Sequence, residues 1–288
     1  MRTLKHLCLL STLILLCLFF TSFHVKIYSS FFSIEHAILK NIVQCHIQSK
    51  GGHKGNCIDM SLINQTNETI TVKVESGRNL LSLDTNKQDI LIVKEEIFVL
   101  APNQQQTKGV FGFCSQSHKS SPSSGEEYTV GEMKDKSTIQ LTEYLAKNEY
   151  PLSAMQSAIW VMTNNRRVEG IFHQNRDSIQ DLMDYVSGLT KQFTPWYSID
   201  YQLNETDLVS DVAKSIYGNF EGELQKNTKV QMVVYDKFNI PQLRKTIIIP
   251  DDSYTHPISL DVSQLPKGRY QLCFFTLGGR VDEKVFTI

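Results

Sequence analysis

The stretch of the sequence with the clearest chemical content is PLSAMQSAIWVMT, residues 151–163. Ser153 follows the proline closely and predicts the start of a helix. Apolar residues then recur at the spacing of one helical face, and Gln156 and Trp160 lie one turn apart on a neighbouring face. A carboxamide on a mostly buried helix needs a hydrogen-bond partner. The partner of Gln156 therefore decides whether this helix carries out chemistry or only holds the fold and binds.

Other polar groups give weaker indications of a site. His46, His53 and His118 lie in or near predicted loops, but their spacing matches no standard set of zinc ligands, so we predict no metal site and no cofactor. Acidic neighbours such as Glu95-Glu96 would point in opposite directions from an extended strand, so they are no acid–base pair. The sequence has no Walker loop, HExxH, CxxC pair or GxSxG. We therefore predict that the protein is not an enzyme and has no catalytic residues.

The first 30 residues resemble an export signal in their composition. Arg2 and Lys5 precede an apolar run, residues 7–23, which is the pattern of a secretory signal peptide. The run is near the short limit for a membrane span, so an uncleaved N-terminal anchor is the alternative. In both cases the chain from about residue 30 leaves the cytosol. We expect a secreted, periplasmic or cell-surface protein.

Export changes how the cysteines are interpreted, since disulfides persist in oxidising compartments. Cys45 and Cys57 bracket the turn-rich segment KGGHKG between two strand-like runs, and we predict a disulfide between them. A disulfide between Cys57 and Cys114 is the next alternative. Cys273 lies in a predicted strand and is expected to be a buried free thiol.

The periodicity of the chain predicts a mainly β protein with helices, in two domains. Residues 31–193 first alternate apolar and polar and then change to the helical period, which predicts a β-sandwich with a helical part. The helices are expected at about 137–147, 153–163 and 178–189, with Ser137 and either Asp177 or Ser178 as caps of the first and third.

Residues 197–288 contain seven strand-like segments with short turns and no helical pattern, which predicts an immunoglobulin-like β-sandwich. The segment Phe193–Tyr197 is the expected linker between the domains. The serine-rich segment Ser115–Gly125 is expected to be an exposed loop.

Three segments of the second domain carry a family resemblance: Val234–Asp236, Asp261–Tyr270 and the closing Lys284–Ile288. They resemble the immunoglobulin-like modules at the C-terminus of bacterial secreted proteins, including type IX sorting domains and flagellar hook-cap-like modules. Val230–Tyr235 lacks the glycine-containing turn usual after this strand. This departure favours a plain structural module over a sorting signal.

The first domain carries a second, shorter resemblance. The segment MQSAIW, residues 155–160, matches the hydrophobic–Gln–x–x–hydrophobic–Trp helix of the thioester domains of bacterial surface adhesins. In that family a cysteine after an aromatic residue or leucine, on an upstream strand, bonds to this glutamine, and Phe113-Cys114 fits that position. The resemblance implies a Cys114–Gln156 thioester that would acylate a host amine. Ser115 departs from the pattern, which has a hydrophobic residue after the cysteine.

In the alternative interpretation Gln156 bonds to backbone carbonyls, Trp160 fills the core, and Cys114 is free or disulfide-bonded. We accordingly expect a non-enzymatic adhesion or interaction protein of the cell envelope or exterior, with the thioester-type covalent adhesin as the alternative. The expected partner is a protein or glycan at a cell surface. A net charge of -1 gives no reason to expect nucleic acid, and only the N-terminal segment would contact a membrane.

Overall fold

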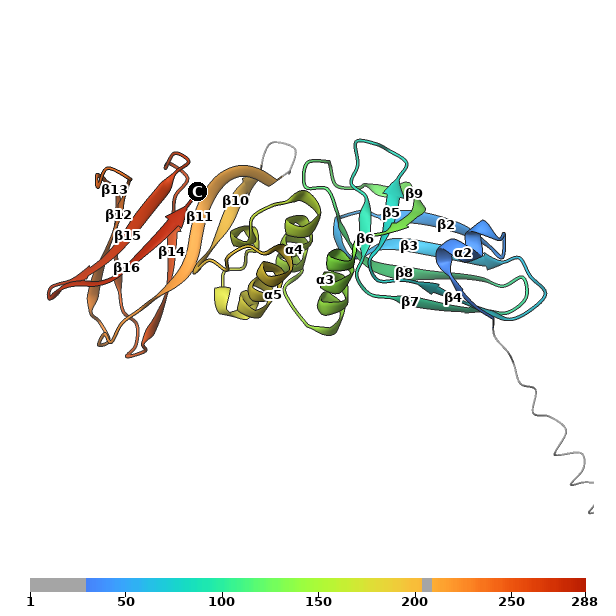
Figure 1. The fold of residues 1–288 in the computed structure, drawn as a ribbon, viewed down its shortest axis with the longest axis horizontal. Helices are drawn as coiled ribbons and strands as arrows, with labels where there is room; N and C mark the ends of the chain where they lie inside the picture. The colour runs from blue at the N-terminus through green and yellow to red at the C-terminus, as the bar shows by residue number, and fades with distance from the viewer. Residues whose placement is uncertain (1–29, 204–208) are drawn as a thin grey trace, which may run out of the picture.

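The structure is a computed structural model that describes residues 30–203 and 209–288. It is mainly β with helices, as the sequence predicts. Figure 1 shows three parts in a row along the molecule: strands β1 to β9, then the helices α3 to α5, then strands β10 to β16. The predicted leader falls on residues that are not described, except for its last residue. No helix within the two described ranges is long and apolar enough to cross a membrane.

Six strands of the first part form a closed barrel in the order β2-β3-β8-β6-β5-β9. Their bounds are β2 (Val43–Lys50), β3 (Lys54–Asn64), β5 (Arg78–Ser82), β6 (Ile90–Ile92), β8 (Gln105–Cys114) and β9 (Ser124–Met133). All pairs are antiparallel. The sequence predicts a sandwich here, and the structure differs because β2 is paired along both edges. Ile47 lies opposite Met60 of β3 on one side and opposite Tyr128 of β9 on the other, which closes the ring.

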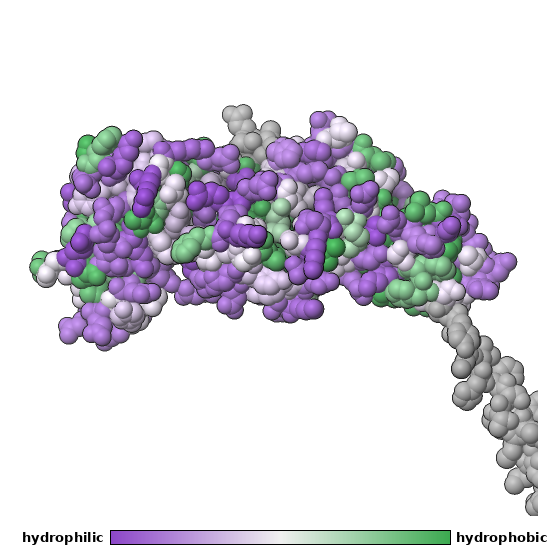
Figure 2. Space-filling model, viewed as in Figure 1, coloured by the Kyte–Doolittle hydropathy of each residue, from purple (hydrophilic) through white to green (hydrophobic). Residues whose placement is uncertain are grey.

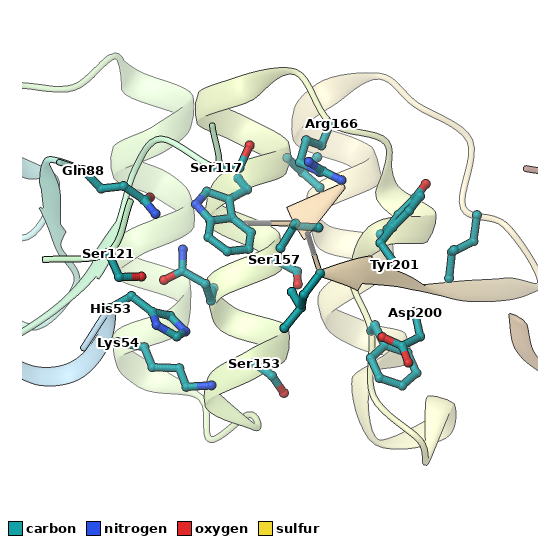
Figure 3. A pocket seen from close by; sticks show the side chains of 18 of the residues that line it. His53, Lys54, Gln88, Ser117, Ser121, Ser153, Ser157, Arg166, Asp200 and Tyr201 are labelled. Carbon is teal, nitrogen blue, oxygen red and sulfur yellow. The ribbon is translucent and has the colours of Figure 1, made fainter. Parts of the chain in front are cut away.

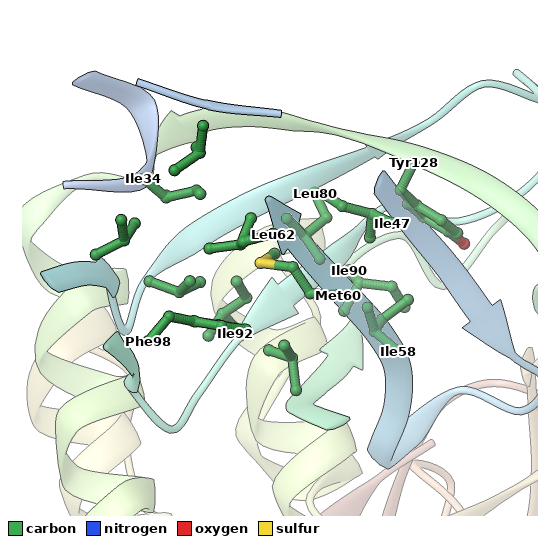
Figure 4. Close-up of a cluster of buried hydrophobic side chains, with 14 of the residues drawn as sticks. Ile34, Ile47, Ile58, Met60, Leu62, Leu80, Ile90, Ile92, Phe98 and Tyr128 are labelled. Carbon is green, nitrogen blue, oxygen red and sulfur yellow. The ribbon is translucent and has the colours of Figure 1, made fainter. Parts of the chain in front are cut away.

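The barrel core follows from the alternation of side chains along each strand. On β3 the buried residues Ile58, Met60 and Leu62 alternate with half-buried polar ones, as expected for a strand with one face inside. Figure 4 shows these side chains meeting Ile47 and Leu80 from neighbouring strands. Such close packing of branched side chains is the main stabilising contribution in this part of the molecule.

A three-stranded sheet and a short helix pack beside the barrel. The sheet has the order β1-β4-β7, with β1 (Ser30–Ser33) parallel to β4 (Ile70–Val74) and β7 (Glu96–Leu100) antiparallel to it. Helix α2 (Ile34–Leu39) begins directly after β1, where the Ser33 side chain accepts a hydrogen bond from the amide of His36. Figure 2 shows a mostly hydrophilic face, with apolar residues gathered at this end of the molecule. Phe31 and Leu39 are among the exposed ones.

Three helices follow the barrel: α3 (Lys136–Lys147), α4 (Leu152–Asn164) and α5 (Gln180–Thr190). The predicted helices are therefore present within one or two residues of their expected bounds. Two short 3-10 turns, η1 (Val168–Gly170) and η2 (Arg176–Ile179), connect α4 to α5. The helices bury their apolar faces on one another and on the outward side chains of β6 and β8.

The three predicted helix caps are wrong. Asp135 caps α3, because its carboxylate accepts from the amides of Ser137 and Thr138 at 3.0 and 3.1 Å. Helix α4 begins after Pro151 without a side-chain cap, so Ser153 lies inside the helix. Helix α5 also lacks a side-chain cap, because η2 supplies a continuous turn before it. Asp177 and Ser178 both lie within that turn.

The last part has seven antiparallel strands in two sheets, as the sequence predicts. The orders are β10-β11-β14 and β13-β12-β15-β16. Their bounds are β10 (Tyr197–Leu203), β11 (Val209–Glu221), β12 (Lys229–Tyr235), β13 (Pro241–Ile248), β14 (Thr255–Asp261), β15 (Arg269–Thr276) and β16 (Gly279–Thr287). Both sheets contribute to one apolar core, in which Phe220 of β11 stacks on Phe274 of β15. Cys273 is buried with a free thiol, as predicted.

The helical part and the last strands contact each other directly. Arg166, after α4, donates to the main-chain oxygen of Ser210 at 3.3 Å and lies over the ring of Tyr201. Asn219 of β11 donates to the Asp177 carboxylate at 2.7 Å. The contact of Arg166 with Tyr201 holds β10 close to the end of α4, and a cavity lies between the two elements.

A buried guanidinium ties α2 to the barrel. The Arg78 side chain is 3% exposed and binds Glu75 at 3.0 Å, Glu35 of α2 at 2.7 Å and the main-chain oxygen of Gly131 at 2.9 Å. We expect Arg78→Met to lower the free energy of unfolding by about 3 kcal/mol, because it leaves the shielded Glu75 carboxylate without a counter-charge. Denaturant unfolding at equilibrium measures this loss.

The matched control is Lys73→Met, which removes the pair with Glu95. Both of those side chains are about a third or more exposed, so its loss should be below about 1 kcal/mol. Equal losses for the two variants would contradict the structural role given to Arg78.

Candidate functional site

Gln156 and Cys114 lie in contact at the boundary between the barrel and the helices. Gln156 is on α4 and is 2% exposed, and its carboxamide nitrogen donates to the main-chain oxygen of Cys114 at 2.6 Å. Cys114 is the last residue of β8. The fold thus brings together the two residues of the predicted thioester, which are 42 positions apart in the sequence. The same bond agrees with the alternative prediction that Gln156 binds backbone carbonyls.

The hydrogen bond between Gln156 and Cys114 depends on how Cys114 pairs with the residue before β3. The amide of Cys114 donates to the main-chain oxygen of His53 at 2.9 Å, in the turn just before β3. In an antiparallel ladder the opposite residue would return its own N–H to the Cys114 oxygen. The Gln156 carboxamide supplies that hydrogen bond instead. A helix side chain therefore completes the ladder at the rim of the barrel, beside His53.

The Cys114 thiol itself packs on the barrel side of β8. Cys114 is fully buried and belongs to the same apolar cluster as Cys57, whereas the preceding Phe113 belongs to the cluster on the helix side. Burial raises the pKa of the Cys114 thiol strongly, and the neighbouring Cys57 and Asp89 add to the rise. At neutral pH this sulfur is therefore a protonated, shielded thiol.

A cavity of about 770 Å³ opens over Gln156 and Trp160. Figure 3 shows its two ends. His53 and Lys54 lie on the barrel side, and Asp200 and Tyr201 of β10 lie on the other, with α4 between them. The cavity is thus built from all three parts of the chain. Its further lining includes Gln88, Ser117, Ser120, Ser121, Ser153, Ser157, Arg166 and Phe172.

Two buried polar atoms at this cavity have no hydrogen-bond partner among the described residues. They are the carboxamide oxygen of Gln156 and the indole nitrogen of Trp160. The prediction that Trp160 fills the core is wrong: the ring is half-buried and lines the cavity, because the core positions of α4 are taken by its smaller apolar residues. Leaving a buried polar group unpaired costs about 1–3 kcal/mol, so these two atoms are well placed to bind a ligand or water.

The start of the loop after Cys114 is held against α4 and is not exposed as predicted, whereas His118, Ser121 and residues 123–125 are exposed. Ser115 is 2% and Ser117 7% exposed. The side chain of Asn164, the last residue of α4, donates to the Ser115 oxygen at 2.9 Å and accepts from the Ser117 amide. Sequence reasoning missed Asn164, because an asparagine at the end of a helix is interpreted as a helix-termination signal and not as a binding residue. Its two hydrogen bonds fix the chain on the C-terminal side of Cys114.

The predicted Cys45–Cys57 disulfide is wrong. All four cysteines of the described chain are free thiols. Cys45 lies opposite Leu62 in the β2–β3 ladder, five positions along the strand from Cys57. At about 3.3 Å per residue this places the two residues about 17 Å apart, whereas a disulfide needs Cα atoms within about 7 Å. The predicted turn is present, but its register keeps the cysteines apart.

The three histidines considered as metal ligands lie in different elements of the structure. No group of three or more His, Cys, Asp or Glu residues suited to a metal ion occurs in the part of the chain that the structure describes. His46 lies on the barrel strand β2, His118 is exposed in the loop, and His53 lines the cavity. Burial lowers the pKa of His53, and the adjacent Lys54 lowers it further. His53 is therefore a neutral imidazole at neutral pH.

No protein-family model matches this chain, and no curated protein matches it significantly. The functional argument therefore rests on the residues and their arrangement.

The free state of the cysteines gives a prediction for thiol labelling. Burial raises the pKa of Cys45 to about 12 and that of Cys57 to about 11, so little thiolate exists at pH 8. In the folded protein we expect both to resist iodoacetamide at pH 8. After unfolding without a reductant both should be alkylated. Peptide mapping by mass spectrometry measures this, and a peptide linking Cys45 to Cys57 would contradict the observed register.

Proposed function

We propose that the protein is an exported, non-enzymatic adhesion protein that attaches to its partner covalently, through a thioester between the Cys114 sulfur and the Gln156 side-chain carbon. The observation that carries the proposal is the buried hydrogen bond from the Gln156 carboxamide nitrogen to the main-chain oxygen of Cys114 at 2.6 Å. It accords with the resemblance of residues 155–160 and of Phe113-Cys114 to thioester domains. Export is inferred from the composition of the N-terminal segment.

The chemistry balances without a cofactor. The Cys114 thiol adds to the Gln156 carbonyl carbon, the carbon–nitrogen bond breaks, and the thiol proton leaves with the nitrogen as ammonia. The product is an internal thioester. A primary amine of the partner then attacks the same carbon, the carbon–sulfur bond breaks, and Cys114 returns to a thiol. The partner remains joined to Gln156 by an amide, so each molecule reacts once and does not turn over.

Two features of the site suit this chemistry. First, Cys114 and Gln156 are almost inaccessible to water, which protects a thioester from hydrolysis. Secondly, Gln156 lines the cavity and its carboxamide oxygen has no hydrogen-bond partner among the described residues, so a partner amine would approach it from that side. The Cys114 thiol packs on the barrel side of β8, so forming the bond requires the sulfur and the Gln156 carboxamide to move into contact.

A second candidate is non-covalent binding in the same cavity. The unpaired carboxamide oxygen of Gln156 and the unpaired indole N–H of Trp160 offer one acceptor and one donor to a ligand. A protein or glycan at a cell surface can supply both kinds of group. In this candidate strands β10 to β16 act as a structural module that presents the cavity outward.

Intact-mass measurement separates the two candidates. We expect the purified protein to be lighter than its sequence mass by one ammonia molecule, and to gain one methylamine on incubation with that amine. Cys114→Ala and Gln156→Ala should each show the unmodified mass and no adduct, because each removes one partner of the bond.

Cys57→Ala is the matched control, since it removes another thiol of the same buried cluster without touching the bond. It should keep both the mass deficit and the adduct. An unmodified mass for the wild-type protein would exclude the covalent mechanism and leave non-covalent binding as the function. If the mass deficit disappears in Cys57→Ala and persists in Cys114→Ala, the thioester cysteine is Cys57 and the assignment of Cys114 is wrong.

A further inference from the structure

We propose that His53 accepts the proton of the attacking amine when the partner opens the thioester. This inference rests on the covalent function proposed above and adds a residue to it. Neither family resemblance points to His53, and in the sequence it is an unremarkable histidine between two glycines and a lysine. In the structure its main-chain oxygen binds the amide of Cys114, and its side chain lines the same cavity as Gln156.

The position of His53 follows from the hydrogen bonds of Cys114. In an extended strand the N–H and the C=O of one residue point to the same neighbouring strand, so both main-chain groups of Cys114 face the same side. The N–H binds the main-chain oxygen of His53 at 2.9 Å, and the C=O binds the carboxamide of Gln156 at 2.6 Å. His53 and the Gln156 carboxamide are therefore neighbours along the same edge. Any side chain at position 53 keeps this contact, because it uses the main chain only.

The imidazole of His53 is free to act as a base. It is half-buried and lines the cavity that opens over Gln156 (Figure 3). Neither ring nitrogen has a hydrogen-bond partner among the described residues. The nearby Lys54 is a cation and donates rather than accepts. Asp200 lies across the cavity on β10 and is paired with Lys214 at 3.6 Å.

The charge state of His53 suits a proton acceptor. Its pKa is lowered by burial and then by Lys54, so the imidazole is neutral near pH 7. The other titratable groups that line the cavity are Lys54, Arg166 after α4, and Asp200 and Tyr201 on β10. An incoming ammonium group is inert as a nucleophile, and a neutral base beside the carbonyl removes the proton released as the new bond forms.

The step balances with the groups present. The amine nitrogen bonds to the Gln156 carbonyl carbon, and one nitrogen proton passes to His53. The carbon–sulfur bond breaks and the electron pair stays on the Cys114 sulfur. The proton then passes from the imidazolium to the sulfur, which restores the thiol. No oxidant, reductant or metal takes part.

The test uses His53→Gln, which keeps a polar side chain and the main-chain contact but removes the base. We expect this variant to retain the mass deficit of one ammonia and to react with methylamine about 100-fold more slowly than wild type at pH 7.5, at the low end for general-base catalysis. His46→Gln, an exposed histidine of β2 outside the cavity, is the matched control and should react at the wild-type rate. Intact-mass spectrometry over time gives both quantities.

The pH profile of the wild type is an independent readout. After division by the fraction of unprotonated amine, the rate should rise with pH and level off above an inflection that lies below pH 6.5, because the unprotonated imidazole is the active form. His53→Gln should lack the inflection. A wild-type profile without it would overturn the proposal even if the variant did not fold.

The remaining outcomes are also decisive. If wild type carries the deficit and His53→Gln reacts as fast, the role of His53 is wrong while the thioester stands. If wild type carries no deficit, the covalent function fails first. If folded His53→Gln has no deficit, His53 acts in forming the thioester and its assignment to the amine step is overturned.

Discussion

One hydrogen bond decides the arrangement of the functional part of this protein: the bond from the Gln156 carboxamide to the main-chain oxygen of Cys114. Strand β8 extends to the rim of the barrel, where His53, just before β3, accepts the N–H of Cys114 but donates no N–H to the Cys114 oxygen. A buried carbonyl left unpaired there would be costly. Helix α4 satisfies it with a side chain, and this fixes the helix against the barrel rim. Asn164 at the end of the same helix holds the chain that follows.

The same bond joins two buried residues, one with a carboxamide and one with a thiol. Burial keeps the Cys114 sulfur protonated and protects it from oxidants. The unpaired oxygen of Gln156 costs stability in the free protein. Groups left unpaired in this way are characteristic of functional sites, where a ligand or a new covalent bond offsets the cost. The cavity lies directly over these groups.

The last two sheets take part in forming the cavity. Strand β10 closes the far side of the cavity with Asp200 and Tyr201, and Arg166 joins the helical part to this strand. A partner that reaches Gln156 therefore also meets a carboxylate and an aromatic ring from the C-terminal part. The arrangement makes the cavity dependent on all three parts of the chain, although each part has its own apolar core.

The sequence by itself determined the features that depend on neighbours along the chain. Helical periodicity located α4, and alternation located the seven last strands, because both reflect which side of a local element is buried. It also singled out Gln156. Only the tertiary structure decided which residues meet across long separations. The pairing of β2 along both edges closes a barrel where the sequence predicts a sandwich. The β2–β3 register separates Cys45 from Cys57. At the barrel rim the Cys114 oxygen receives no N–H from the neighbouring strand, and Gln156 binds it instead. Register and closure depend on the whole ring of strands, so no local pattern encodes them.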